Sequence, residues 1–193
     1  MKRCITALLM AAASFGVAGQ TLDPAKSAIT AVSRQMNVPV EGKFTKFTGQ
    51  IAFDPSKPDA GKAEFTIDTA SFSVGNAEID DEAKGKNWFD VKNFPQARFM
   101  STAVKAAGPG RFEVTGPLTI KGKTNTVTIP FTVKADGGAA VYEGVFPIKR
   151  LAFNIGEGVW KDTDTVTDEV QMRFRLVMTG GKPAAVPGKK QSP

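Results

Sequence analysis

The sequence contains no histidine, and its single cysteine, Cys4, stands among the first few residues. Without an imidazole, serine-histidine-aspartate and cysteine-histidine catalysis are excluded. Zinc sites, which draw mainly on histidine and cysteine, are disfavoured almost as strongly. A pH switch based on histidine is also excluded. Chemistry in this chain therefore depends on carboxylates, amines and hydroxyls, or there is none.

No segment approaches the ~20 apolar residues that a transmembrane helix needs. An apolar run extends from Ile5 to Val17, preceded by Lys2 and Arg3 and followed by the small pair Ala18-Gly19. This charge order predicts a signal peptide over residues 1–19, cleaved near Ala18-Gly19, and favours it over a buried N-terminal helix. We expect a periplasmic or secreted protein that relies on its core, since Cys4 leaves with the signal.

A strong charge of one sign is also lacking. The net charge is +6 over the chain, and three lysines belong to the Pro/Gly-rich segment 181–193, which predicts a disordered basic tail. The remaining domain, predicted over residues 20–180, is close to neutral. No basic stripe with interleaved aromatics is present, so nucleic acid is not an expected partner.

Apolar and polar residues alternate along most of this domain, which is typical of half-buried strands. Short turns rich in Gly, Pro and Asn separate the runs, as in antiparallel sandwiches and barrels. We predict an all-β fold of about eight strands, drawn from the runs Ile29–Met36, Val38–Phe53, Ala63–Asp68, Ala97–Val104, Phe112–Thr115, Val127–Val133, Tyr142–Phe153 and Val170–Leu176. Gly42 and Gly49 are expected to allow bends in the second run.

One stretch does not fit this alternation. Residues Val74 to Lys86 carry acidic side chains early and lysines late. This polarity suits the macrodipole of a short helix. We therefore expect one short helix beside the strands.

Gly122-Lys123-Thr124 resembles the end of a phosphate-binding loop, which requires G-x-x-x-x-G-K-[ST]. The first glycine of that pattern would be residue 117, which is Pro117. The residues that follow alternate with period two and do not predict a helix. Lys121 to Thr124 is thus predicted to be the turn of a β-hairpin.

The hairpin belongs to a set of motifs that resembles the YceI family. Gly116 to Thr124, followed by Val127, is similar to the family's G-x-L-T-[IL]-[KRH]-G-x-T-x-x-V signature. Three further segments match in order, namely Gly42–Pro55, Trp88–Phe99 and Phe153–Val170. The resemblance implies an exported, lipocalin-like antiparallel β-barrel whose apolar interior holds a polyisoprenoid or a similar long-chain lipid.

The resemblance also implies a binding protein rather than an enzyme, with no cofactor and no metal. Family histidines near the first strands and in the segment here occupied by Glu78 to Lys84 are absent, so their contacts do not carry over. The expected partner is a long-chain lipid, and the sequence leaves the oligomeric state open, a dimer included.

Candidate lining residues are apolar and lie mostly at alternating strand positions. They are Met36, Phe44, Phe47, Ile51, Phe65, Ile67, Phe99, Phe146 and Phe174. A lipid tail in such a lining would gain ~0.8 kcal/mol for each methylene removed from water. Arg34 and Lys46 are the candidate contacts for a phosphate head group.

Two alternatives remain open at the level of sequence. The first is a ligand-free interaction module, since a filled core accounts for the same 14 phenylalanines. The second, less favoured, is a hydrolase that uses carboxylates alone. Its candidates are Glu78, Asp80, Asp81 and Glu82 in one cluster and Asp162, Asp164, Asp168 and Glu169 in another.

Overall fold

The computed structural model describes residues 20–180, which form twelve strands, one α-helix and five short 3-10 helices. The predicted signal peptide and basic tail lie outside the described residues. The strands are β1 Gln20–Leu22, β2 Ala28–Gln35, β3 Val38–Phe44, β4 Phe47–Ala52, β5 Lys62–Asp68, β6 Phe72–Ser73, β7 Gln96–Met100, β8 Ala103–Gly108, β9 Arg111–Ile120, β10 Lys123–Asp136, β11 Ala139–Lys149 and β12 Glu169–Thr179. The helices are α1 Ala77–Lys84, η1 Pro24–Lys26, η2 Pro58–Ala60, η3 Thr69–Ser71, η4 Arg150–Phe153 and η5 Gly158–Lys161.

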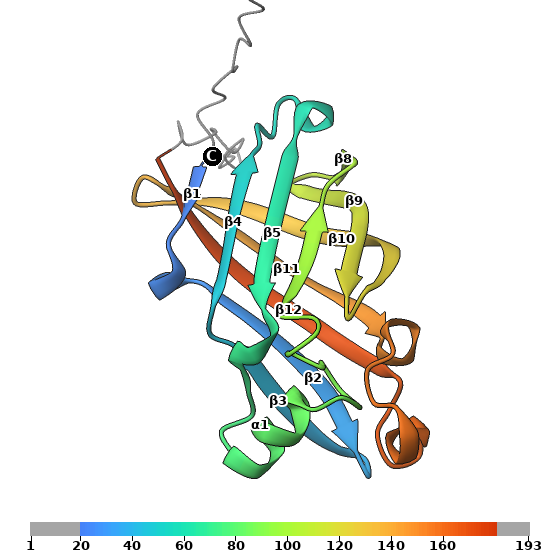
Figure 1. Cartoon of the computed structure of the whole chain (residues 1–193). Coiled ribbons are helices and arrows are strands. Elements are labelled where there is room, and N and C mark those ends of the chain that lie inside the picture. The colour runs from blue at the N-terminus through green and yellow to red at the C-terminus, as the bar shows by residue number, and fades with distance from the viewer. Residues whose placement is uncertain (1–19, 181–193) are drawn as a thin grey trace, which may run out of the picture.

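The strands close into an antiparallel barrel. Pairing runs in the order β1, β4, β5, β7, β9, β10, β11 and β12, and β12 pairs back with β1 through Thr21 opposite Thr179. Further along, β12 pairs with β2, which continues to β3 and β6 at the end of the molecule where α1 lies (Figure 1). The predicted all-β barrel of about eight strands with one short helix is confirmed.

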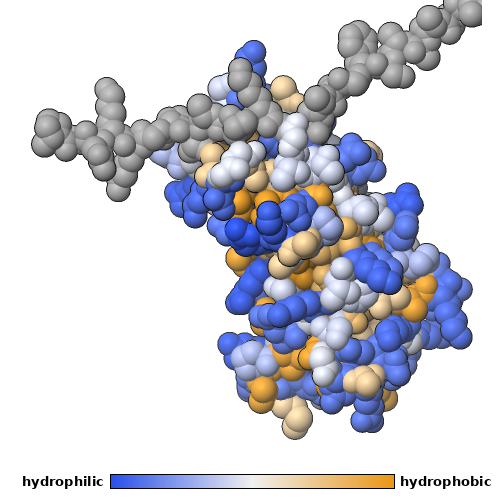
Figure 2. Space-filling view, turned by 90° about the vertical axis from the view of Figure 1, so that its left-hand side faces the viewer, coloured by the Kyte–Doolittle hydropathy of each residue, from blue (hydrophilic) through white to orange (hydrophobic). Residues whose placement is uncertain are grey.

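Alternation along the strands places their apolar side chains inside the barrel. In β9 every second residue from Phe112 to Ile120 is buried, and the residues between them are half-buried. Arg173 and Arg175 of β12 face outward, while Leu176 and Met178 are buried. Hydrophilic side chains cover most of the face shown in Figure 2, with hydrophobic ones in scattered patches. This is the period-two pattern that the sequence predicts.

The run Val38–Phe53 does not form one strand bent at its glycines, as expected from the sequence. It breaks at Thr45 and Lys46, because their N–H groups leave the ladder to bind the carbonyl and hydroxyl oxygens of Ser71. Gly42 and Gly49 have a different use. A Cβ at either position would collide with the ring of Phe72 or Phe65 respectively, so the two glycines make room for aromatic side chains.

Two other predicted strands end earlier than expected. The run Ala97–Val104 divides at Ser101, whose N–H and hydroxyl both bind the backbone of Ala63, each at 2.8 Å. The strand predicted to reach Phe153 stops at Lys149, and η4 follows. Arg150 is on the inward side, in phase with Phe146 and Ile148, and its guanidinium binds carbonyls of the loop that follows.

Lys121 and Gly122 form the two-residue turn that joins β9 and β10. Both have positive φ angles, 46° and 71°, which is the backbone of a tight hairpin turn. No helix follows, since β10 begins at Lys123. The hairpin prediction is confirmed, and the phosphate-loop interpretation fails for this reason.

Helix α1 lies within the predicted stretch and has the expected polarity. Asn76 caps it by accepting hydrogen bonds from the N–H groups of Glu78 and Ile79. Acidic residues occupy its first turn and Lys84 its last. Within residues 20–180, none of the helices has the length and apolarity needed to cross a bilayer.

Candidate functional site

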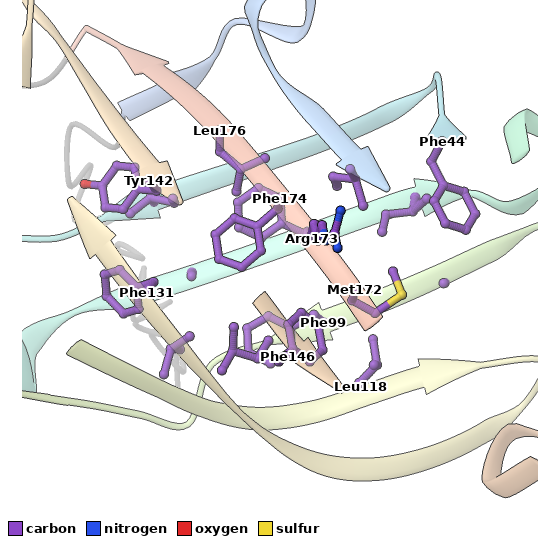
Figure 3. Close-up of a pocket in the computed structure, with 18 of the residues that line it drawn as sticks. Phe44, Phe99, Leu118, Phe131, Tyr142, Phe146, Met172, Arg173, Phe174 and Leu176 are labelled. Atoms are coloured by element: carbon purple, nitrogen blue, oxygen red, sulfur yellow. The ribbon is translucent and has the colours of Figure 1, made fainter. Parts of the chain in front are cut away.

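The barrel encloses an apolar cavity of about 140 Å³. Figure 3 shows Phe131 and Tyr142 at one end of it, Phe99, Phe146 and Phe174 in the middle, and Phe44 at the other end. These side chains come from β3, β7, β10, β11 and β12, so the cavity follows the barrel interior. Apolar cavities of about this size remain dry and accept apolar molecules.

Four aromatic rings form a cluster at one end of this inner cavity. Phe53 lies at its centre, 4.9 Å from Phe112, 5.3 Å from Phe131 and 6.1 Å from Tyr142 between ring centroids. The phenol of Tyr142 donates a buried hydrogen bond to Gln20 of β1 at 2.9 Å. Desolvation raises the pKa of Tyr142 to about 12. The polar atoms at this end are therefore satisfied within the protein.

A second, larger chamber of about 740 Å³ adjoins the other end. Strands β2 and β3, helix α1 and the segments around η4 and η5 supply its walls. Five residues line both spaces, which makes them neighbouring compartments, and these are Phe44, Phe89, Ile120, Ile148 and Met172. The chamber falls within the range of about 300–1,000 Å³ that is common for small-molecule sites.

The burial pattern agrees with a hollow interior. Phe65, Ile67, Met172 and Phe174 belong to the inner wall but are only half-buried. A filled core of close-packed side chains leaves no such exposure on inward-facing residues. The interior thus has room for a slender apolar ligand.

Most of the predicted lining residues are brought together by the fold. Those that line the inner cavity are Phe44, Ile51, Phe65, Ile67, Phe99, Phe146 and Phe174. Phe47 is buried but belongs to neither cavity wall. Their contact with a ligand stays a prediction.

The placement of Met36 differs from the prediction. Met36 is 75% exposed and lies outside both cavity walls. It forms the β2–β3 turn with Asn37, and both residues have positive φ angles. A turn of this type directs its side chains away from the sheet interior, which removes Met36 from the lining.

The two candidate head-group residues also lie outside the cavity walls. Arg34 alternates with Ser33 and Gln35, which face the chamber, so its side chain is on the outer surface, where it donates to the Asn37 carbonyl at 3.2 Å. Lys46 is exposed at the break between β3 and β4. The structure does not bring them together at the chamber.

Arg150 is instead the basic residue of the chamber wall, and the sequence did not single it out. It is 1% exposed, and its guanidinium donates five hydrogen bonds of 2.6–3.2 Å. All five acceptors are main-chain carbonyls, those of Ile155, Gly156, Trp160, Val166 and Thr167. Burial lowers the pKa of Arg150, and the charge of Asp168 opposes this shift. The side chain organises the loops around the chamber and uses its full set of donors.

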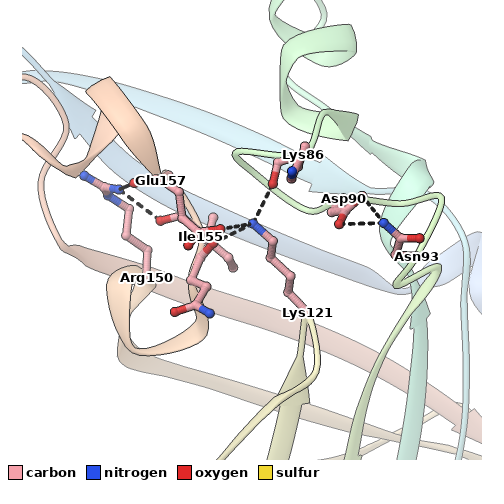
Figure 4. A network of polar contacts seen from close by, with 9 residues as sticks. Lys86, Asp90, Asn93, Lys121, Arg150, Ile155 and Glu157 are labelled. Carbon is pink, nitrogen blue, oxygen red and sulfur yellow. Dashed lines mark hydrogen bonds and ion pairs between the residues drawn. The ribbon is translucent and has the colours of Figure 1, made fainter.

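Lys121 performs a similar role from the β9–β10 turn. Its ammonium group donates to the carbonyls of Lys86 and Asn154 and to the carboxylate of Glu157, at 2.7–2.8 Å (Figure 4). The bond from Lys121 lowers the pKa of Glu157. Three chain segments that border the chamber are thus joined at one buried cation.

Trp88 was noted in the sequence only as part of a motif, yet its ring lies in the chamber wall. The ring centroid is 5.5 Å from that of Trp160 and 5.9 Å from the guanidinium carbon of Arg150. Within residues 20–180, Trp88 Nε1 is the one buried side-chain nitrogen or oxygen without a hydrogen-bond partner. No sequence signal separates a satisfied tryptophan from this one.

Two of the carboxylates considered for a hydrolase, Asp80 and Asp162, have lowered pKa values. Asp80 accepts hydrogen bonds from Ser73 and the Val74 N–H, which lower its pKa. Asp162 accepts bonds from Thr165 and Asp164, with the same effect on its pKa. A general acid at neutral pH needs a raised carboxyl pKa instead. The Asp80 bonds tie the end of β6 to α1, and the Asp162 bonds shape the loop before β12.

Comparison with known proteins identifies relatives across most of the chain. A model described as a YceI-like domain matches residues 20–178. A UPF0312 protein of Pseudomonas savastanoi is 38% identical over 98 residues, 51% of this chain and 51% of the relative. The chain thus spans about half the length of the Pseudomonas relatives it matches. A UPF0312 protein of Ectopseudomonas mendocina is 32% identical over 131 residues, 65% of this chain and 69% of the relative.

Solved structures share the barrel. BcnA of Burkholderia cenocepacia is 54% identical, with a TM-score of 0.80 over 82% of this chain and 99% of that one. A polyisoprenoid binding domain from Saccharophagus degradans has a TM-score of 0.69 at 15% identity, over 84% of this chain and 98% of that one. At that identity, the second likeness shows a common fold.

Proposed function

The chain belongs to the YceI-like domain family, and from this premise we propose that it is an exported, non-catalytic protein that binds a long-chain amphiphilic lipid of the polyisoprenoid type. The tail occupies the inner cavity and part of the larger chamber, and the head lies at the chamber. The protein acts in the periplasm or outside the cell. The observation that carries this proposal is the apolar cavity that adjoins the chamber, with five wall residues common to both.

Such binding requires no catalytic group and no specific polar contact. Each methylene that leaves water contributes ~0.8 kcal/mol, so a long tail binds through apolar contact alone. The inner wall supplies that contact with phenylalanine rings and branched aliphatic side chains. The Saccharophagus degradans domain with this fold is described as polyisoprenoid binding, which supports the choice of ligand class.

Native mass spectrometry of the protein exported to a bacterial periplasm tests the proposal. We expect a discrete added mass that organic extraction releases as an isoprenoid or fatty-acyl compound. A polypeptide that stays bare after incubation with several long-chain lipids would contradict the proposal and favour the ligand-free interaction module. Cell fractionation tests the export directly.

A variant that fills the boundary between the two compartments sharpens this test. Met172 lines both spaces and is half-buried, so Met172→Trp extends a ring into free volume without compressing a packed core. We expect it to lose the bound mass. Val145→Trp is the matched control, since Val145 is 50% exposed on the outer face of β11. It should keep the bound mass.

A further inference from the structure

We propose that the protein docks on the surface of a phospholipid bilayer with the end that carries the chamber, through exposed apolar side chains around the chamber mouth. The inference rests on the proposed lipid-binding function and adds the surface at which the ligand is exchanged. A long-chain lipid passes through water only at a large cost in free energy. A mouth that faces the bilayer gives it an apolar route instead.

The chamber opens beside helix α1. Glu78, Ile79 and Asp81 of this helix line the chamber and are also exposed, so solvent reaches the chamber here. Gln35 at the end of β2 and Trp160 of η5 line it as well, and both are half-buried. Three segments thus surround the mouth, and together they are called the chamber rim: residues 35–38, α1 and residues 158–166.

Hydrogen bonds join these segments into a continuous rim. Trp160 Nε1 donates to Glu82 at 3.0 Å, which links η5 to α1. The N–H of Met36 in the β2–β3 turn donates to the Thr165 carbonyl at 2.9 Å, which links that turn to the loop after η5. Figure 1 shows α1 and the tips of β2 and β3 at one end of the molecule and β1 and β8 at the other. The rim therefore forms one end of the protein.

Exposed apolar side chains concentrate on this rim. Within residues 20–180 six large hydrophobic side chains are exposed, and four of them belong to the rim, namely Met36, Val38, Ile79 and Val159. Val159 at 82% and Met36 at 75% are the most exposed of the six. Val38 pairs with Gln35, on the chamber side of β2 and β3, so apolar surface continues from the chamber wall to the turn. Exposed apolar groups gathered in this way mark an interaction site.

Both tryptophans of the chain lie at the same end. Trp160 follows Val159 directly, and the Trp88 ring is 5.5 Å from that of Trp160 between centroids. Tryptophan is enriched where proteins meet the membrane interface, because its ring is apolar and its N–H is polar. The position of the two rings favours a bilayer as the partner.

The charges at the mouth distinguish a bilayer from a second copy of the chain. Glu78, Asp81 and Glu82 line the chamber at its mouth. In a two-fold dimer through the rim these carboxylates would face their own copies and repel. The outermost charge of phosphatidylcholine or phosphatidylethanolamine is an ammonium group, which complements them. The rim is therefore suited to a zwitterionic bilayer, and anionic lipids should weaken the contact.

Flotation with phospholipid vesicles tests this surface. The rim variant combines Met36→Asn with Val159→Ser. Neither residue lines a cavity, and asparagine tolerates the positive φ of 49° at position 36. The matched control combines Met100→Asn with Val145→Ser, the two exposed large hydrophobic residues that lie on β7 and β11 rather than on the rim. Thermal melting of each variant confirms that it is folded.

We expect the wild type and the control variant to float with phosphatidylcholine vesicles. The rim variant should bind them about tenfold less or weaker still, since two large apolar side chains no longer leave water on docking. Added phosphatidylglycerol should reduce binding of the wild type. Phospholipids brominated in their acyl chains should quench the tryptophan fluorescence of the wild type and have much less effect on the rim variant.

A transfer experiment connects the surface with ligand exchange. An isoprenoid alcohol offered in phosphatidylcholine vesicles should enter the rim variant more slowly than the wild type, by a similar factor. The same alcohol offered from dilute ethanol should load both proteins to the same occupancy, which native mass spectrometry measures.

The possible failures are distinct. If the wild type takes up the alcohol from ethanol but does not float with vesicles, or floats no better than the rim variant, the docking surface is overturned and lipid binding stands. A dimer in solution that the rim substitutions dissociate, without vesicle binding, would assign the rim to a second copy and overturn the proposal as well. Absence of uptake from either source would overturn the proposed function itself.

Discussion

The ammonium nitrogen of Lys121 lies 2.8 Å from a carboxylate oxygen of Glu157, a residue 36 positions further along the chain. The lysine side chain is 5% exposed and the glutamate 38%. One partner is thus buried and the other reaches water. This asymmetry lets the pair hold the loops of the chamber together without placing two charges in the interior.

Replacing Lys121 with methionine should destabilise the protein by about 2–4 kcal/mol, since the carbonyls of Lys86 and Asn154 lose their donor. Chemical denaturation measures this loss. Lys123→Met, at an exposed position just beyond the same turn, is the control and should change stability by no more than about 0.5 kcal/mol. If Lys121→Met changed the stability as little as Lys123→Met, the Lys121 contacts would contribute nothing to stability.

The bond from Lys121 to Glu157 predicts that part of the protein's stability depends on pH in the acidic range. Because the folded pKa of Glu157 lies below its usual 4.5, its contribution is present above about pH 4.5 and disappears as the pH falls through the lowered value. Glu157→Gln should therefore unfold with a weaker dependence on pH in this acidic range. In a Lys121→Met background the same substitution should have a smaller effect, since only Lys161 and Lys86 then lower the pKa of Glu157. An unchanged acid profile in the single variant contradicts the prediction.

Tyr142 predicts the opposite dependence at alkaline pH. Its folded pKa, about 12, lies above the usual 10.0, so the stability it provides is present below pH 10 and is lost as the pH rises toward 12. Tyr142 is the single tyrosine of the chain, so ultraviolet absorbance of the phenolate reports on it alone. We expect a midpoint near 12 for the folded protein, and Tyr142→Phe should lack both the signal and this part of the stability loss. A midpoint near 10 would mean that the phenol is not buried.

Substitution of Arg150 by lysine tests the carbonyl cluster at the chamber. Lysine has three donors, so at least two of the five carbonyls lose their partner, at a cost of about 1–3 kcal/mol each. The melting temperature should fall accordingly. Arg173→Lys, on the outer face of β12, serves as the control and should have little effect. If Arg150→Lys melts with the wild type, the guanidinium has no structural role.

Sequence pattern predicts the barrel well because strand alternation is a local property. Phe112, Phe131 and Phe174 follow it, and each points inward as expected. The ends of strands are harder to predict, since they depend on distant partners. Ser71 and Ser101 end or interrupt strands through hydrogen bonds to residues distant in the sequence. The sequence around a serine does not indicate such a bond.

The cavity itself is only partly predictable. Phe47 and Phe65 lie on the same face of the β4–β5 pair, yet only Phe65 lines the cavity, because the packing around each ring decides where space remains. The polar end of the site is less predictable still. Arg34 is out of phase with the inward residues of β2, whereas Arg150 is in phase with those of β11. The carbonyls that accept from Arg150 are gathered only by tertiary folding.

The seam between β1 and β12 has a kinetic consequence. Thr21 and Thr179 are 158 positions apart, so the ring closes only when the two ends of the domain meet. Contacts of such sequence separation slow folding to milliseconds or longer. We expect the β9–β10 hairpin to form early and the seam late, so that the space for a ligand exists only after the final step. A ligand held inside must then leave or be exposed when the seam opens, and it should slow unfolding in a stopped-flow experiment while leaving the folding rate unchanged.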